Sequence, residues 1–285
     1  MYYNGSNAFA NLRQGLVGAW CPSLPNGGSG NTLPDVSGYN NHGSLVNMGP
    51  EDWVSAQYGR ALDFDGVNDH IVVSHQPFAS LQQGTITGWV NTSNDVEQAL
   101  FALANTSDSN QFAILGYAGN FTGTLTNELV YFAIRGFSGT DLATFGYTTS
   151  NRSELIDGKW HHIALVVNGV SASSIYLDGI SKSITVSNQF PTSNQGQFFG
   201  DLTGLNRCLI GAGQLGASIF SYASGGQDDV RIYNRALSES EIKLLASRPG
   251  IGLRQESHRN TFYQFPSFQP ALARRSSAII GGGIT

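Results

Sequence analysis

Oxygen-bearing side chains gather at two points in the sequence. Asp35 opens the segment DVSGYNNHG at 35–43, which also holds Asn41, and the pair Asp228-Asp229 stands directly before an apolar alternation. Calcium takes roughly six to eight oxygen ligands from carboxylates, amides and backbone carbonyls. We therefore expect one structural calcium with Asp35, Asn41, Asp228 and Asp229 as ligands. In the simpler alternative, Asp35 caps a turn and Asp228 lies at a solvated strand end.

Other reactive side chains form no recognisable site in the sequence. His161 and His162 are adjacent on a predicted strand, so their side chains point to opposite faces and cannot chelate one zinc ion. Cys21 and Cys208 are too few for a disulfide scaffold and lack metal-ligand spacing, so we expect two free thiols. The sequence contains no local signature of a nucleophile with its base, and no phosphate loop.

The elements that must position these groups are short strands. Val230 and Ile232 alternate with other residues at the period of two, which predicts a half-buried strand. Ser238 precedes Glu241 by three residues, the spacing of a capping box, and Pro249 marks the stop. A short helix should therefore follow this strand.

Strand patterns recur along the chain with turn residues between them. The candidates are 15–20, 60–66, 70–73, 85–90, 99–104, 111–115, 129–135, 161–167, 174–177, 183–186 and 208–210. Such a series predicts an all-β fold, a two-sheet antiparallel jelly-roll sandwich with one short C-terminal helix and an extended tail. The turn-rich loop at 22–43 is long enough to need a functional role or a staple such as an ion.

Charge is sparse and unevenly placed. Charged residues make up 12% of the chain, with 20 acidic and 15 basic residues, which argues against nucleic-acid binding. We find neither an apolar run of membrane-spanning length nor an export signal at the start, so we expect no membrane partner and no secretion through a signal peptide.

Composition divides the chain into an N-terminal arm at 1–13, the sandwich at 14–247 and a basic, aromatic tail at 248–285. Disordered tails are poor in aromatic residues, so we expect this tail to dock on a partner. Its candidate partner-binding residues are Arg254, Arg259, Phe262, Tyr263, Phe265, Phe268, Arg274 and Arg275.

Several motifs resemble one known family when taken together and in order. GLVGAW at 15–20, ALDFDG at 61–66, TITGWV at 85–90, GKWHHIALV at 158–166 and DDVRIYNRALSESEI at 228–242 resemble laminin G-like and pentraxin-like domains of the concanavalin A-like lectin/glucanase superfamily. The resemblance covers about residues 15–247. It implies two antiparallel sheets, carbohydrate or protein binding, and often a calcium near the last strand, which carries a calcium role onto Asp228 and the Asp35 loop.

The resemblance implies no catalytic site. Retaining glucanases of the superfamily carry Glu-x-Asp-x-x-Glu on one strand, and this motif does not occur here. Asp63 and Asp65 share a strand face, but the turn residue Gly66 favours a rim position for them, so we expect no enzymatic activity. An aromatic platform for sugars is open, as is the alternative that the same aromatic side chains cover the sandwich edge. The platform candidates are Tyr117, Phe121, Phe137 and Tyr147.

An adhesive sandwich without an export signal fits a virion protein that is made in a bacterial host. We therefore predict a non-enzymatic bacteriophage capsid decoration or fibre component with a lectin-like binding domain. It is expected in the virion as a homo-oligomer, bound to other virion proteins through its tail and to cell-surface glycans. The main alternative is a bacterial carbohydrate-binding or adhesion module, extracellular or at the cell surface. A divergent glycoside hydrolase using Asp63 and Asp65 is the remaining alternative.

Overall fold

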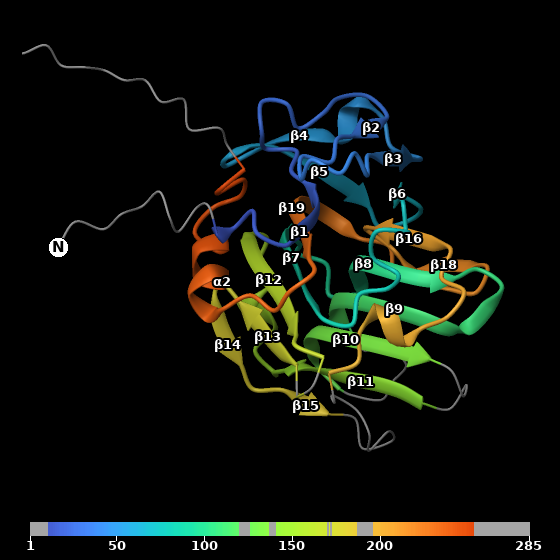
Figure 1. Ribbon diagram of the computed structural model, residues 1–285. Coiled ribbons are helices and arrows are strands. Elements are labelled where there is room, and N and C mark those ends of the chain that lie inside the picture. The colour runs from blue at the N-terminus through green and yellow to red at the C-terminus, as the bar shows by residue number, and fades with distance from the viewer. Residues whose placement is uncertain are drawn as a thin grey trace, which may run out of the picture. The chain divides into compact units, whose positions relative to one another are not determined.

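Two antiparallel sheets face each other across an apolar core in the computed structural model (Figure 1). The structure describes residues 11–119, 126–136, 141–169, 171, 173–186 and 196–253, with the backbone alone at 141–143. The predicted all-β sandwich with a short helix is confirmed for this part of the chain. In the same described part, no helix has the length and apolar character needed to cross a membrane.

The first sheet is ordered β14-β13-β12-β7-β19-β5-β4. Its long strand β19 pairs with β5 through its first half and with β1 through its second half. The strands are β1 (Leu16–Trp20), β4 (Trp53–Ala56), β5 (Gly59–Asp65), β7 (Gly84–Asn91), β12 (Trp160–Val167), β13 (Ser174–Leu177), β14 (Ile180–Lys182) and β19 (Ser224–Tyr233).

The second sheet is ordered β15-β11-β10-β9-β8-β16-β6-β3-β2. Its strands are β2 (Thr32–Leu33), β3 (Gly43–Val46), β6 (His70–Val73), β8 (Gln98–Asn105), β9 (Asp108–Gly119), β10 (Glu128–Gly136), β11 (Asp141–Thr148), β15 (Thr185–Val186) and β16 (Arg207–Ile210). The strand predicted at 183–186 is observed only as β15, over its last two residues, and β14 ends before it. The sequence analysis did not identify β3, β4 or β11.

Shorter elements complete the fold. The hairpin β17 (Gly213–Leu215) and β18 (Ser218–Phe220) covers the outer face of the second sheet. The described residues also form 3₁₀ turns at η1 (Pro50–Asp52), η3 (Arg152–Glu154) and η4 (Phe199–Asp201). The helix α2 (Glu239–Leu245) follows β19 and begins with the predicted capping box between Ser238 and Glu241.

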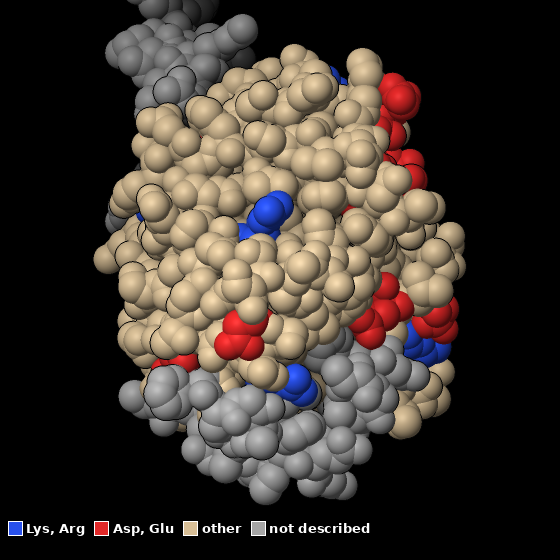
Figure 2. Space-filling model, turned by 90° about the vertical axis from the view of Figure 1, so that its right-hand side faces the viewer, with Lys and Arg blue, Asp and Glu red and all other residues tan. Residues whose placement is uncertain are grey.

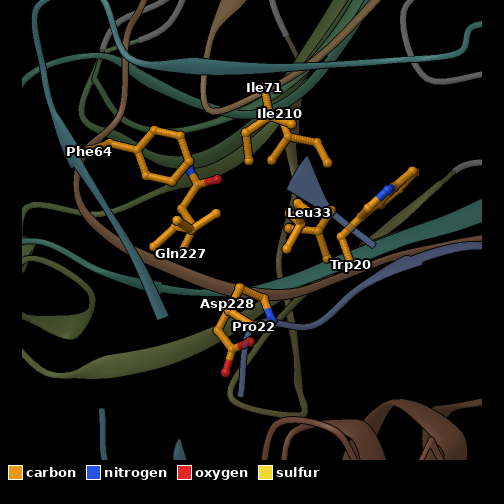
Figure 3. A pocket seen from close by; sticks show the side chains of 10 residues that line it. Trp20, Pro22, Leu33, Phe64, Ile71, Ile210, Gln227 and Asp228 are labelled. Atoms are coloured by element: carbon orange, nitrogen blue, oxygen red, sulfur yellow. The ribbon is translucent and has the colours of Figure 1, made fainter. Parts of the chain in front are cut away.

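The core between the sheets is almost completely filled. Figure 3 shows Trp20 from the first sheet opposite Leu33, Ile71 and Ile210 from the second sheet. The cavity among these side chains measures about 10 Å³, room for at most about one water molecule. This cavity is therefore part of the core and not a ligand site.

A second apolar layer covers the outer face of the first sheet. Ile242 and Leu245 of α2 are buried there together with Ile251 and Leu253, which follow the helix. Figure 1 shows α2 beside β13 and β14. The prediction of a half-buried β19 is wrong, because this layer buries its second face as well.

The packed residues extend past the predicted limits of 14–247 on both sides. Leu12 is fully buried and Leu253 is 6% exposed. The Arg13 side chain donates hydrogen bonds to the carbonyl oxygens of Gly252 and Leu253, at 3.0 and 2.9 Å. The segments at 11–13 and 250–253 therefore hold each other at the edge of the sandwich.

Candidate functional site

The Asp35 loop is held by hydrogen bonds. One carboxylate oxygen of Asp35 accepts from the backbone N–H groups of Ala19 and Ser37, at 2.9 and 2.8 Å. The other accepts from the Ser37 hydroxyl at 2.8 Å and from the Asn41 N–H at 3.0 Å. A carboxylate has roughly four acceptor sites, and all of them are used here. Asp35 therefore caps the turn, as the simpler alternative predicted.

The Asp228-Asp229 pair lies inside the fold and not at a solvated strand end. Both residues are 2% exposed, at a bulge of β19 where Asp229 has the left-handed φ of 51°. Asp229 accepts hydrogen bonds from Nε and Nη2 of the fully buried Arg231, both at 2.8 Å, and from the Gly250 N–H. Burial raises the pKa of Asp228 to about 7, and the Asp229 charge adds to the rise.

These four residues do not fit a calcium ion. Asp35 has no acceptor site to spare, Asp229 is neutralised by Arg231, and one carboxylate oxygen of the buried Asp228 accepts from the N–H groups of Ser23 and Asp229. The Asn41 side chain donates through Nδ2 to the Val17 carbonyl oxygen, at 3.2 Å. Among the described residues, no three His, Cys, Asp or Glu side chains form a metal-binding group. The loop at 22–43 is thus stapled by hydrogen bonds to β1.

The predicted aromatic platform does not form as expected. Tyr117 is 1% exposed and belongs to the inter-sheet core, where its hydroxyl accepts from Nε2 of Gln227, so its assignment to a ligand surface is wrong. Tyr147 is half-buried and donates its hydroxyl to Glu154 at 2.9 Å. Phe121 and Phe137 lie outside the described residues, as do all eight candidate residues of the tail.

The structure brings a different set of polar residues together. Asp95, Val96, Glu97, Gly119, Asn127 and Arg152 line a pocket of about 210 Å³. They come from the β7–β8 connection, the end of β9, the residue before β10 and the turn η3. The pocket therefore lies where the ends of neighbouring strands meet.

Arg152 organises one side of this pocket. Its Nε and Nη2 atoms contact the Asp95 carboxylate at 2.6–3.3 Å, and its Nη1 donates to the Glu128 carbonyl oxygen at 2.8 Å. The Arg152 side chain is 21% exposed, against 54% for Asp95. The guanidinium is therefore fixed in place, while the carboxylate still faces solvent.

Glu97 forms the other acidic wall. Its Oε1 accepts a hydrogen bond from the Ser221 hydroxyl. Burial raises the pKa of Glu97, and the Ser221 bond opposes this rise. A Cβ atom on residue 119 would lie 2.3 Å from the Glu97 Cα atom, so only glycine lets the end of β9 approach so closely. Beside it, Val96 is 49% exposed and adds apolar surface to the pocket.

None of these pocket residues was predicted from the sequence. Asp95 and Arg152 are far apart in sequence and belong to no motif. The feature that they share in the sequence is their location, since each lies in a polar connection next to the end of a strand. Only the strand pairing shows that these connections are neighbours.

The remaining candidates for chemistry have structural roles. His161 and His162 are neighbours on β12, so their side chains point to opposite faces, and Nε2 of the buried His162 lies 3.2 Å from the Thr87 hydroxyl oxygen. Cys21 and Cys208 are buried free thiols, as predicted.

The Asp63 and Asp65 carboxylates are exposed side chains of β5. Asp65 accepts hydrogen bonds from the N–H groups of Val67, Asn68 and Asp69, so it holds the turn after β5. This geometry gives Asp65 a structural role at the strand end.

One face of the molecule carries little charge. Figure 2 shows one face of the molecule on which neutral side chains predominate and charged ones stand in small, separate groups. Recognition on such a face depends on local hydrogen bonding more than on long-range attraction.

Solved structures share this fold at low sequence identity. A CBM40 domain of the Ruminococcus gnavus IT-sialidase, bound to α2,3-sialyllactose, aligns with a TM-score of 0.53 and 15% identity, over 65% of this chain and 96% of that one. Domain 4 of AbnA, an extracellular GH43 arabinanase from Geobacillus stearothermophilus, in complex with arabinotriose, aligns with 0.55 and 18% identity, over 81% and 98%.

A third similar structure is the binding domain of Paraclostridial Mosquitocidal Protein 1. It aligns with a TM-score of 0.54 and 18% identity, over 82% of this chain and 52% of that one. These likenesses establish the fold alone. The sequence has no significant match among curated proteins.

The family comparison is more direct. Residues 65–243 match the laminin G-like family described as the concanavalin A-like lectin/glucanases superfamily. The match runs from the end of β5 into α2 and so includes strands of both sheets, the pocket residues and the buried pair of β19. The chain therefore belongs to the concanavalin A-like lectin/glucanase superfamily.

Proposed function

We propose that this chain is a non-enzymatic carbohydrate-binding module whose ligand enters the polar pocket. The observation that carries the proposal is the convergence of Asp95, Glu97, Asn127 and Arg152 beside the exposed side chain of Val96. Sugar hydroxyls both donate and accept hydrogen bonds, and carboxylate, amide and guanidinium groups supply both kinds of partner. Val96 offers a contact for the C–H groups of a sugar ring.

The fold supports this proposal. Its structural neighbours include domains solved with sialyllactose and with arabinotriose, each in a protein that acts on sugars. The largely neutral face in Figure 2 suits a ligand that is recognised by hydrogen bonds.

Binding is favoured over hydrolysis by the state of the carboxylates. Glycoside hydrolysis needs one carboxylic acid that can donate a proton and a second, ionised carboxylate across the bond. Asp95 is paired with the Arg152 guanidinium, and Asp65 is occupied by its turn. Neither of these carboxylates is placed to act as the acid.

A glycan array followed by calorimetry tests the proposal. The wild-type protein should bind at least one oligosaccharide, and Asp95→Ala should weaken that binding at least about tenfold, the value of one charge-assisted hydrogen bond. Asp63→Ala removes an exposed carboxylate outside the pocket and should leave the affinity unchanged. Equal affinities for the three proteins would place the ligand elsewhere, and no binding to any glycan would refute the function.

A second proposal concerns the setting of this module and rests on the sequence alone. The basic, aromatic tail favours a virion component that is anchored through residues 254–285, with the binding domain exposed outside the producing cell. An extracellular or cell-surface module is the other setting.

Truncation distinguishes the two settings, and the structure improves its design. Ile251 and Leu253 belong to the packed fold, so the deletion should begin at residue 254 and not at 248. The shortened protein should stay folded and bind the same glycan, but should no longer enter particles. Normal incorporation into particles would refute the attachment role of the tail.

A further inference from the structure

We infer that the pocket selects uncharged, hydroxyl-rich sugars and rejects sugars that carry a carboxylate. This inference rests on the proposed function and adds the ligand class to it. It follows from the charges of the described lining residues and from the bonds that Arg152 already makes.

The pocket lining is acidic. Asp95 and Glu97 contribute two negative charges and Arg152 one positive charge, so the formal sum is −1. A sugar carboxylate in this pocket would be close to two like charges, in a partly desolvated site where screening is weaker than in bulk water.

The charge of Arg152 is already compensated by Asp95. Its Nε and Nη2 atoms already form a bidentate pair with Asp95, and its Nη1 is bound to the Glu128 carbonyl oxygen. Asp95 is part of the protein, so its contact with the guanidinium does not incur the loss of translational and rotational entropy that a free ligand suffers on binding. To form the same paired contact with the guanidinium, a carboxylated sugar would have to displace Asp95 and leave that carboxylate unpaired.

Hydroxyl groups meet no such penalty. The exposed Asp95 carboxylate can accept from sugar hydroxyls while it remains paired with Arg152, because each oxygen has more than one acceptor site. The guanidinium has five N–H groups, and the bonds to Asp95 and Glu128 leave some of them for hydroxyl oxygens. A neutral sugar thus gains hydrogen bonds and breaks none of the existing pairs.

Two domains of the same fold can therefore differ in whether they prefer anionic or neutral sugars. The Ruminococcus gnavus domain was solved with the anionic sugar sialyllactose, at 15% identity to this chain. Here the acidic lining works against an anionic ligand, which is specificity through repulsion as well as attraction.

Matched sugars test the inference by calorimetry at pH 7. The pairs are lactose with α2,3-sialyllactose, and galactose disaccharide with its galacturonic acid counterpart, alongside any neutral glycan found on the array. The wild-type protein should bind the neutral member of a pair at least about tenfold more tightly than the charged one.

The double variant Asp95→Asn/Glu97→Gln provides the decisive comparison. It removes two negative charges and releases Arg152, so the formal charge of the lining changes from −1 to +1. The preference should then reverse in favour of the carboxylated sugars. Asp63→Asn, which changes an exposed carboxylate outside the pocket, should keep the wild-type preference.

The outcomes separate the two proposals. Tighter binding of the carboxylated sugars by the wild-type protein would overturn the inference while the proposed function stands. An unchanged preference in a folded double variant, checked by circular dichroism, would also overturn it. If the wild-type protein binds no sugar of the panel or array, the proposed function fails, and the inference fails with it.

Discussion

Arg231→Met removes the buried cation that ties β19 to the segment after α2. The Arg231 side chain is completely buried, and its Nη2 donates to the Ile251 carbonyl oxygen at 2.8 Å as well as to Asp229. Methionine is a flexible apolar residue that fills much of the vacated space. The substitution therefore mainly tests charge and hydrogen bonding.

The expected loss of stability is large because one charge stays behind. Asp229 is 2% exposed, and without Arg231 it keeps only the hydrogen bond from the Gly250 N–H. Breaking a buried ion pair by removing one partner costs about 3–5 kcal/mol. In a domain of roughly 150–250 residues each kcal/mol lowers the Tm by about 2–4 °C, so the fall should be roughly 6–20 °C by these two rules.

Urea unfolding followed by tryptophan fluorescence at pH 7 measures this loss. The exposed Lys243–Glu239 pair on α2 supplies the control, since Lys243→Met removes a pair whose side chains are more than half exposed and should change stability little. Asp229→Asn/Arg231→Met should recover part of the loss, because no unpaired charge remains in the interior. A loss below about 1 kcal/mol for Arg231→Met would refute the reasoning about the buried pair.

Two further perturbations test the interior at other points. Burial lowers the pKa of His162 from the usual 6.5 to about 4. Between these two pH values the unfolded chain binds a proton that the native protein does not bind, so the stability of the native protein falls as the pH falls. The stability difference between wild type and His162→Gln should shrink by about 3 kcal/mol from pH 7 to pH 4 in urea unfolding, because contributions common to both proteins cancel; a constant difference would contradict the burial argument. Gly116→Ala would place a Cβ atom 2.1 Å from the Tyr131 ring and should lower the Tm more than Gly88→Ala, whose Cβ atom would meet the movable end of Leu100 at 2.8 Å. The reverse order in thermal melts would show that the ring yields more easily than the leucine.

Local patterns were sufficient to predict the fold class and most strands. The strand predicted at 85–90 corresponds to β7 (Gly84–Asn91), and Asp178-Gly179, a dipeptide typical of hairpin turns, joins β13 and β14 with positive φ at both residues. The capping box at Ser238 also forms as expected. These features depend on neighbours within a few residues, so their signal is present in the sequence itself.

Residues whose environment was predicted wrongly depend on contacts that are distant in sequence. The polarity of Arg231 indicated an exposed strand face, yet α2 and the residues after it cover that face. Tyr117 lies on β9, in a segment that reads as loop sequence, but its side chain turns into the core and its hydroxyl meets Gln227 of β19. In both cases the environment of the side chain is set by an element far away along the chain.

The sequence by itself therefore determined the sandwich, its strands, the capped helix and the family, because periodicity and turn chemistry act over a few residues. Only the tertiary structure decided what the acidic residues do. In the structure Asp35 accepts hydrogen bonds within a turn, Asp229 forms an ion pair with Arg231, and Asp95 forms an ion pair with Arg152 at the pocket. The role of a carboxylate depends on which donors approach it, and those donors come from segments that only strand pairing brings together.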